Sequence, residues 1–328
     1  MNPMTAIARY VLLSLAENGH FGAAAGIQWL WKKLKPSKEA SRYFFFLKQT
    51  SLIKRRVSSR PAESRKVFPC YLINRKTDRA RLERFDKSAV RIGLDYDRVE
   101  AVNALERNFD FTPYQKIIAK KFYGESLFPK GMIGCFLSHY KCWHMLRSSG
   151  ADMGCIFEDD AQVLVSPQRA LNSRNIPQDA DIIFLNQRIS EGFMDAETLA
   201  KIRNGGVFFA DAFDAVKRTY QKGLSIDGVG TDGYLVTSKG ANKLIEMFNE
   251  HKLYQCIDWE ILINSFKGTE FEEFVTLHGN KHFTHIDCGI RSYVMIPSIV
   301  RQRDLGSILG MQNKNNLAEY DEMFGVKG

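Results

Sequence analysis

Short apolar runs alternate with amphipathic stretches through the middle of the chain. The apolar run 70–73 predicts a strand, and the stretch after it predicts a helix that begins at Thr77 and ends at Gly93. A second strand is expected over 97–102. The helix should bury one face, formed by Leu82, Phe85, Ala89 and Ile92.

The same alternation continues through the second half of the chain. A helix is expected over 134–147, and short strands are expected at 154–157 and 181–185. Another strand, at 234–236, leads into a helix with a buried face of Ala241, Leu244, Ile245 and Phe248. Strands that alternate with helices of this length predict an α/β domain built on a central, mainly parallel sheet.

The predicted strand 154–157 runs into three consecutive carboxylates, Glu158, Asp159 and Asp160. Open α/β sheets bind ligands at the carboxyl ends of their strands. Because three adjacent anions repel one another, a cation or strong donors should lie opposite them, and a hard divalent metal is the natural counter-charge. In the alternative interpretation, one acid caps the following turn and the other two are solvated.

The net charge of +9 has its source in the N-terminal segment 1–66. That segment contains thirteen Lys or Arg and three Asp or Glu, whereas the rest of the chain contains 33 Lys or Arg and 34 Asp or Glu. Basic residues interleaved with aromatics such as Trp29 and Trp31 suit an anionic membrane surface. Nucleic acid presents similar phosphates, although we expect no such partner, and a small helical domain with a solvated basic face is a further alternative.

We expect three parts: a basic, helical and aromatic extension with a linker at 1–66, an α/β domain at 67–304, and a polar tail at 305–328. No apolar stretch approaches the roughly 20 residues that span a bilayer. The six cysteines have no paired spacing, which is typical of free thiols in a reducing compartment. The expected location is therefore cytoplasmic, at the inner face of the cytoplasmic membrane.

Three common site motifs are absent from the sequence: the glycine-rich dinucleotide fingerprint, the Walker loop and the Gly-x-Ser-x-Gly elbow. What remains is a set of acids at one strand end, with basic residues near the first strand. This combination suits a nucleotide-sugar site, where a metal and Arg or Lys side chains neutralise a diphosphate.

Several segments together resemble glycosyltransferase family 25, the lipooligosaccharide galactosyltransferase type. They occur in the family's order and extend over roughly Val67 to Arg303, leaving out the first 66 residues and the polar tail. The matching segments are Tyr71–Arg75 with Asp78–Arg79, Glu100–Ala104, Gly134–His139, Ile156–Asp160, Gly233–Val236 with Ser238–Ala241, and Ile257–Asp258.

The resemblance implies a GT-A-like nucleotide-sugar-binding fold, a UDP-sugar donor and inversion at the anomeric carbon. It implies transfer of a hexose, galactose being expected, to a saccharide or glycolipid acceptor during assembly of lipopolysaccharide, lipooligosaccharide or another surface glycan. The expected cofactor is Mn²⁺ or Mg²⁺.

Among the matched acids, Asp160 is the expected metal ligand on the donor diphosphate. Glu158 should assist, through the metal or through the donor ribose. Asp159 should point away from Glu158, because neighbouring residues of a strand face opposite sides.

Asn74, Arg75 and Arg79 follow the first strand, where the uridine or its phosphates would lie, and we expect them to bind the donor. For the two arginines, an alternative is a surface ion pair with Asp78 or Glu83.

Ser138 and His139 follow a glycine, and we expect them to open a helix and to direct amide donors and a polar side chain at the donor. His139 could equally be a packed helix histidine.

An inverting transfer needs a carboxylate that deprotonates the acceptor hydroxyl, and Asp258 is the candidate base. Its alternative role is a helix N-cap. Two other function classes stay open at this point: a catalytically silent, membrane-associated adaptor with the same fold, and a metal-dependent phosphohydrolase that uses the same acids.

Overall fold

The computed structural model describes residues 68–122, 126–127, 129–171, 176–186, 188, 193, 207–224, 226 and 229–302. The predicted extension at 1–66 and the predicted tail at 305–328 lie outside these described residues. The domain boundaries proposed for both therefore stay predictions.

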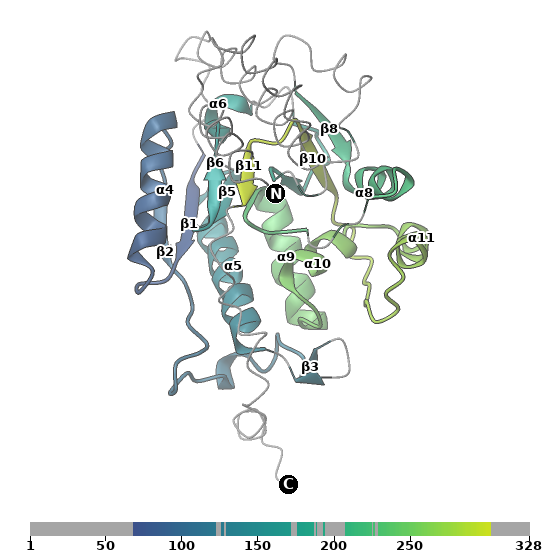
Figure 1. Cartoon of the computed structure of the whole chain (residues 1–328). Coiled ribbons are helices and arrows are strands. Elements are labelled where there is room, and N and C mark those ends of the chain that lie inside the picture. Colours follow the sequence, from purple (N-terminus) through teal and green to yellow (C-terminus); the bar gives the residue numbers. More distant parts are fainter. Residues whose placement is uncertain are drawn as a thin grey trace, which may run out of the picture.

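A seven-stranded sheet forms the centre of the described part, and helices lie on both of its faces (Figure 1). The strand order is β2-β1-β5-β9-β7-β10-β8. The strands are β1 (Cys70–Asn74), β2 (Asp97–Glu100), β5 (Met153–Glu158), β7 (Ile182–Phe184), β8 (Phe208–Asp211), β9 (Gly233–Thr237) and β10 (Ser292–Ile296).

Strands β2, β1, β5, β7 and β10 run in one direction, and β9 and β8 run against them. The prediction of an α/β fold on a mainly parallel central sheet is thus confirmed, and the arrangement is GT-A-like. The antiparallel β9 lies in the middle of the sheet, between β5 and β7. The described part also has two small antiparallel sheets of two strands each. One pairs β6 (Ala161–Val163) with β11 (Val300–Gln302), and the other pairs β3 (Lys121–Phe122) with β4 (Ser126–Leu127).

The helices of the described part follow the apolar patterns of the sequence. They are α4 (Arg79–Ile92), the 3₁₀ helix η3 (Thr112–Tyr114), α5 (Lys130–Ser149), α6 (Pro167–Ala170), α8 (Ala212–Gln221), α9 (Ser238–His251), α10 (Ile257–Ile263) and α11 (Gly268–His278). None of the described helices is long and apolar enough to cross a membrane. All six cysteines are free.

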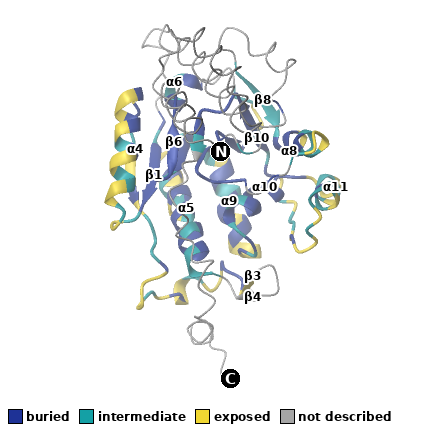
Figure 2. Cartoon of the chain, viewed as in Figure 1, coloured by how far each residue is buried: buried dark blue, intermediate teal, exposed yellow. Residues whose placement is uncertain are grey.

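The alternation of side chains along the strands divides the core into two layers. On β5, Ile156 packs with the layer that contains α5 and α9, whereas Cys155 and Phe157 pack with the layer under α4. The Phe157 ring lies 6.0 Å from that of Phe85 on α4. Figure 2 shows the result, with a buried sheet and an outer face of α4 that is exposed. Burying one such side chain contributes about 1.5–3 kcal/mol.

Three predicted boundaries are wrong by up to one turn. The first described helix is capped by Asp78, not Thr77, although it ends at Gly93 in the left-handed conformation as expected. α5 begins at Lys130 instead of Gly134, because the buried Met132 and Ile133 extend its apolar face. β2 ends at Glu100.

Gly134 is required for packing inside α5. A Cβ atom there would lie 2.6 Å from the carbonyl oxygen of Val102, which is closer than atoms can approach. The glycine therefore lets α5 pass directly beside the chain that follows β2, and so fixes the helix next to the end of β5.

Candidate active site

Acidic side chains gather at one edge of the sheet. β1 and β5 end together there, with Ile73 paired to Glu158. The antiparallel β9 begins at the same edge, because Gly233 pairs with Phe157, and the Glu158 amide donates to the Asp232 carbonyl oxygen at 3.2 Å. α10 adds Asp258, whose Oδ2 accepts from the Gly230 amide at 3.2 Å.

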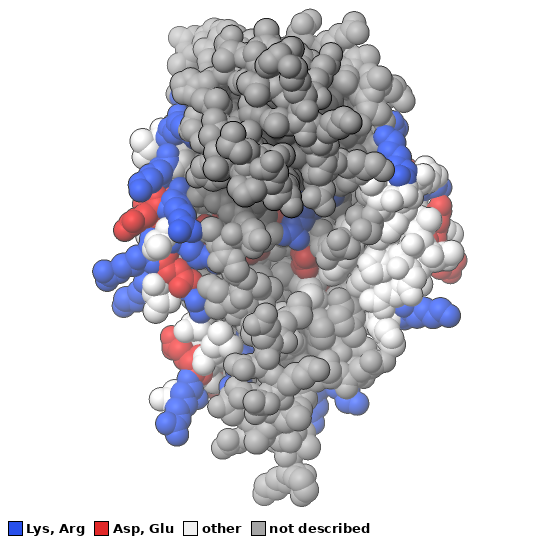
Figure 3. Space-filling model, in the orientation of Figure 1, with Lys and Arg blue, Asp and Glu red and all other residues white. Residues whose placement is uncertain are grey.

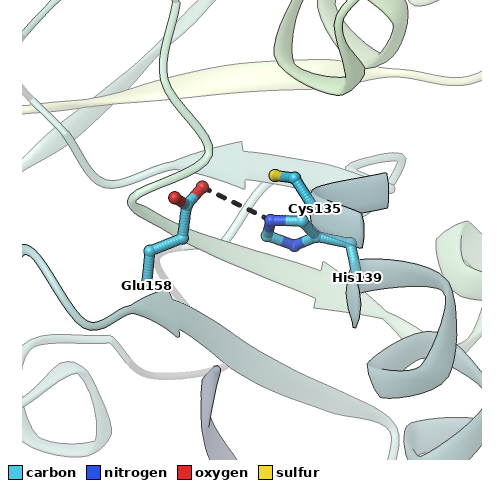
Figure 4. A group of neighbouring side chains, drawn as sticks. All are labelled: Cys135, His139 and Glu158. Atoms are coloured by element: carbon cyan, nitrogen blue, oxygen red, sulfur yellow. Dashed lines mark hydrogen bonds and ion pairs between the residues drawn. The ribbon is translucent and has the colours of Figure 1, made fainter. Parts of the chain in front are cut away.

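Glu158 faces the α5 side of the sheet. Its Oε1 accepts from the Thr231 hydroxyl at 2.6 Å and lies 3.4 Å from His139 Nε2. Figure 4 shows His139 and Cys135 projecting from α5 toward this carboxylate. Burial opposes the ionisation of Glu158, but the hydrogen bonds to His139 and Thr231 and the charge of Arg188 outweigh it, so its pKa is lowered.

His139 is fully buried and has a partner on each ring nitrogen. Nδ1 lies 3.0 Å from the Tyr234 hydroxyl, which also accepts from Trp143 Nε1 at 2.9 Å. This is the geometry of a packed helix histidine that positions Glu158. A direct contact of His139 with a donor stays a prediction that the structure does not test.

Asp159 faces the opposite side of the sheet, as the strand alternation predicts. Its two oxygens accept from Asn74 Nδ2 and from Arg81 Nη1, each at 2.7 Å. Arg81 Nη2 also lies 3.6 Å from Asp160 Oδ2. Burial raises the pKa of Asp159, although the Asn74 and Arg81 contacts oppose that rise. Arg81 is therefore a counter-charge of the acidic triplet, and none of the three acids is fully solvated.

The three residues predicted to bind the donor after the first strand have different environments. Arg75 forms a two-point ion pair with Asp78, at 2.8 and 3.1 Å, as in the alternative interpretation. Arg79 is exposed at the first position of α4. Asn74 is 1% exposed and accepts from Arg98 Nε at 3.0 Å while holding Asp159. Donor binding by these three residues stays a prediction.

Ser138 and His139 do not open a helix. They lie inside α5, so their amides are used within the helix, and the argument that these amides face an anion is wrong. The Ser138 hydroxyl donates to the Gly134 carbonyl oxygen at 2.6 Å and accepts from the Val102 amide at 2.9 Å. The first contact lies within α5, and the second joins α5 to the chain after β2, which is a structural role.

Asp258 is not the N-cap of α10. Cys256 holds that position, and Asp258 lies in the first turn with its carboxylate directed at Gly230. Burial raises its pKa, although the backbone hydrogen bonds from Gly230 and Trp259 and the charge of Arg188 oppose the rise. The role of Asp258 as the general base stays a prediction.

Replacing Arg81 tests its part in holding the acids. Arg81→Gln should lower the free energy of unfolding by about 2 kcal/mol, because it removes a charged hydrogen bond from a buried carboxylate. Arg79→Gln, on the exposed side of the same helix, should change it by less than about 0.5 kcal/mol. Urea unfolding of both variants measures the difference. Equal stabilities would show that Arg81 contributes nothing to the triplet.

The site has the donor atoms that a hard divalent cation needs. Both carboxylate oxygens of Asp232 are buried without a hydrogen-bond partner among the described residues. Burial and the charges of Glu158 and Asp160 raise the pKa of Asp232 to about 8, although Arg188 opposes them. Because a cation would relieve this excess of buried negative charge, the residues present fit Mn²⁺ or Mg²⁺.

A second group of possible metal ligands, which includes a thiol and an imidazole, lies beside these acids. The ligand atoms of Cys135, His139 and Glu158 all lie within 4.8 Å of one another (Figure 4). Burial, together with the charges of Glu158 and Asp258, raises the pKa of the Cys135 thiol well above its usual value. Because a protonated thiol is a poor ligand for hard cations, the oxygen donors are the better site for Mn²⁺ or Mg²⁺.

The sequence did not single out four residues of this site: Arg81, Arg188, Thr231 and Asp232. Arg81 could have been found, because it lies four residues before Phe85 on the inner face of α4, whereas Arg79 lies on the outer face. Asp232 precedes a predicted strand. Only the antiparallel direction of β9 brings it to the acidic edge.

Comparison with known proteins identifies the family of the chain. The sequence model of glycosyltransferase family 25 (LPS biosynthesis protein) matches residues 67–259, which is more than half of the chain and includes all of the acids above. Procollagen galactosyltransferase 1-A of Xenopus laevis is 26% identical over 187 residues, which cover 53% of this chain and 27% of that protein. Procollagen galactosyltransferase 1-B of the same organism is 26% identical over 188 residues, with the same coverage.

Proposed function

Because the chain belongs to glycosyltransferase family 25, we propose that it transfers galactose from UDP-galactose to a saccharide or glycolipid acceptor, with inversion at the anomeric carbon. The observation that carries the proposal is the cluster of Glu158, Asp160, Asp232 and Asp258 at one sheet edge, inside the matched range. Galactose is proposed because both relatives named above are galactosyltransferases. We propose a role in lipopolysaccharide or other surface glycan assembly from the description of the family.

In the proposed reaction, Asp258 removes the proton from the acceptor hydroxyl. The acceptor oxygen attacks the anomeric carbon on the face opposite the diphosphate, and the bond between that carbon and the diphosphate oxygen breaks. UDP leaves with the electron pair of that bond. The Gly230 amide orients the Asp258 carboxylate, and the position of Asp258 on α10 separates it from the acids that follow β5.

Asp160 and Glu158 are the proposed holders of the divalent cation. When bound, this cation supplies a positive charge that stabilises the leaving diphosphate. His139 and Thr231 fix the Glu158 carboxylate, and Arg81 fixes Asp159 beside it. These contacts hold the acids in place before the donor binds, which lowers the cost of organising the site.

A panel of nucleotide sugars tests the proposed donor. With Mn²⁺ present, UDP release from UDP-galactose should exceed UDP release from UDP-glucose and GDP release from GDP-mannose. Equal rates for all donors, or preference for the guanosine nucleotide, would contradict the donor assignment.

We also propose that the chain binds the inner face of the cytoplasmic membrane through residues 1–66. The charge of that segment supports this, and in the described part exposed Lys and Arg side chains line the outer side of α4, at the left of Figure 3. Juxtamembrane basic residues each contribute about 1 kcal/mol at an anionic surface.

Removal of residues 1–66 should abolish binding to anionic vesicles and leave donor hydrolysis close to that of the full chain, because the site lies in the remaining part. Vesicle sedimentation with anionic and neutral lipids measures this. Equal binding of the full chain to both lipid types would contradict an electrostatic anchor, and an unfolded truncated chain would show that the segment is structural.

A further inference from the structure

Asp232 reaches the acidic edge because β9 runs against its neighbours. β9 begins at Gly233, which pairs with Phe157 in antiparallel register. The preceding residue therefore lies beside the residue that ends β5, and the Glu158 amide donates to the Asp232 carbonyl oxygen at 3.2 Å. Opposed residues of an antiparallel pair project on the same side of the sheet. The topology thus brings together two carboxylates at the same sheet edge. Glu158 ends a parallel strand, and Asp232 directly precedes an antiparallel strand.

The Asp232 side chain is 1% exposed, and neither of its carboxylate oxygens has a hydrogen-bond partner among the described residues. Its electrostatic neighbours include Glu158 and Asp160, which repel its charge, and Arg188, which attracts it. A buried carboxylate in this environment is costly unless a proton or a cation neutralises it. Asp159 is different: it is also buried, but both of its oxygens accept hydrogen bonds.

The turn before β9 leaves space for this carboxylate. Gly230 has a φ of 73°, and a Cβ atom there would lie 2.4 Å from Asp232 Oδ1 and 2.9 Å from Arg188 Nε. The Gly230 amide donates to Asp258, and the Thr231 hydroxyl donates to Glu158. Residues 230 and 231 therefore use their polar groups to hold the other acids, whereas the oxygens of Asp232 stay available to a ligand.

We propose that Asp232 is a third carboxylate ligand of the divalent cation that Glu158 and Asp160 hold. This inference rests on the proposed function, since it concerns the same metal site. Carboxylate oxygens are the ligands that Mn²⁺ and Mg²⁺ prefer. A third carboxylate, from the residue that precedes β9, would join the two halves of the sheet edge through the ion.

Direct Mn²⁺ binding to the full chain, without donor or acceptor, tests the assignment. The electron paramagnetic resonance signal of free Mn²⁺ reports the unbound ion. Asp232→Asn should weaken Mn²⁺ binding about 10-fold or more, because even the loss of a residue that only supports a metal ligand costs about 10- to 100-fold. Asp160→Asn should weaken it similarly. Asp95→Asn, an exposed aspartate between α4 and β2, is the matched control and should bind as the wild type does.

A change of ligand type provides a second readout that does not depend on the stability of Asp232→Asn. Asp232→Cys places a soft thiolate at the same position, and thiolates favour soft metals over Mn²⁺. This variant should lose Mn²⁺ affinity and gain a Cd²⁺ site, seen as sulfur-to-cadmium absorption in the ultraviolet above that of the wild type. A thiol placed away from the ion would produce no such gain.

The outcomes separate this inference from the proposed function. Normal Mn²⁺ affinity in Asp232→Asn, with weakened affinity in Asp160→Asn, would overturn the role of Asp232 and leave the metal site of the proposed function intact. The absence of a Cd²⁺ gain in Asp232→Cys would also overturn it. A wild-type chain that binds no Mn²⁺ would overturn both the inference and the metal-dependent part of the proposed function.

Discussion

Asp160→Asn should reduce sugar transfer from UDP-galactose by about 100-fold or more while the protein stays folded. The substitution keeps the shape of the side chain and removes one negative charge from the cation site. Stabilisation of a leaving diphosphate by a bound cation amounts to several kcal/mol, and each 1.4 kcal/mol corresponds to a tenfold change in rate. Initial rates of UDP release at saturating donor and Mn²⁺ measure the effect.

The control for this variant is stability. Asparagine keeps the shape of the Asp160 side chain, and Arg81 keeps its 2.7 Å bond to Asp159, so the melting temperature should stay close to that of the wild type. More than about a tenth of wild-type activity, with an unchanged dependence on Mn²⁺, would refute the assignment of Asp160 as a metal ligand.

Asp258→Asn should lower transfer by about 10²- to 10⁴-fold, which is the usual contribution of a general base. Asparagine keeps an oxygen that accepts the Gly230 amide, so the local structure should persist. The variant cannot take a proton from the acceptor. Binding of UDP and Mn²⁺, measured by calorimetry, should therefore match that of the wild type although turnover is lost.

Asp287→Asn is the matched control for Asp258. Asp287 is exposed and its Oδ1 likewise accepts a backbone amide, from Gly289 at 3.2 Å. This control should retain wild-type transfer. Unchanged transfer in Asp258→Asn would show that Asp258 is not the base. Weakened Mn²⁺ binding in that variant would show that Asp258 is a metal ligand instead.

The fold was largely predictable because local patterns determine it. The apolar face of α4, the strand before Asn74 and the left-handed Gly93 each follow from residues close in the sequence. The position of β9 was not predictable in this way. Its residues indicate a strand, but they do not encode that it runs antiparallel between β5 and β7, since strand direction depends on contacts across the whole sheet.

The candidate site was predictable only where the sequence places its residues together. The triplet 158–160 is visible as a run of acids, and the opposite directions of Glu158 and Asp159 follow from strand alternation. The sequence predicts donor binding by Arg75 because this residue follows the first strand directly, and it does not single out Arg81. Arg75 pairs with Asp78, which is the alternative that the sequence also offered, and the sequence alone does not decide between an ion pair and a free arginine at the site.

Direct observation of the bond that is broken in UDP-galactose tests the central claim. Proton nuclear magnetic resonance of the wild-type chain with UDP-galactose and Mn²⁺, without acceptor, should show slow formation of UDP and of β-galactose, before the sugar equilibrates with its α form. Water then replaces the acceptor, and the carbon–oxygen bond is cleaved with inversion. Both products should disappear in Asp160→Asn and Asp258→Asn. Formation of galactose 1-phosphate and UMP would instead show a phosphohydrolase, and an absence of cleavage with any UDP-hexose would contradict the enzymatic function altogether.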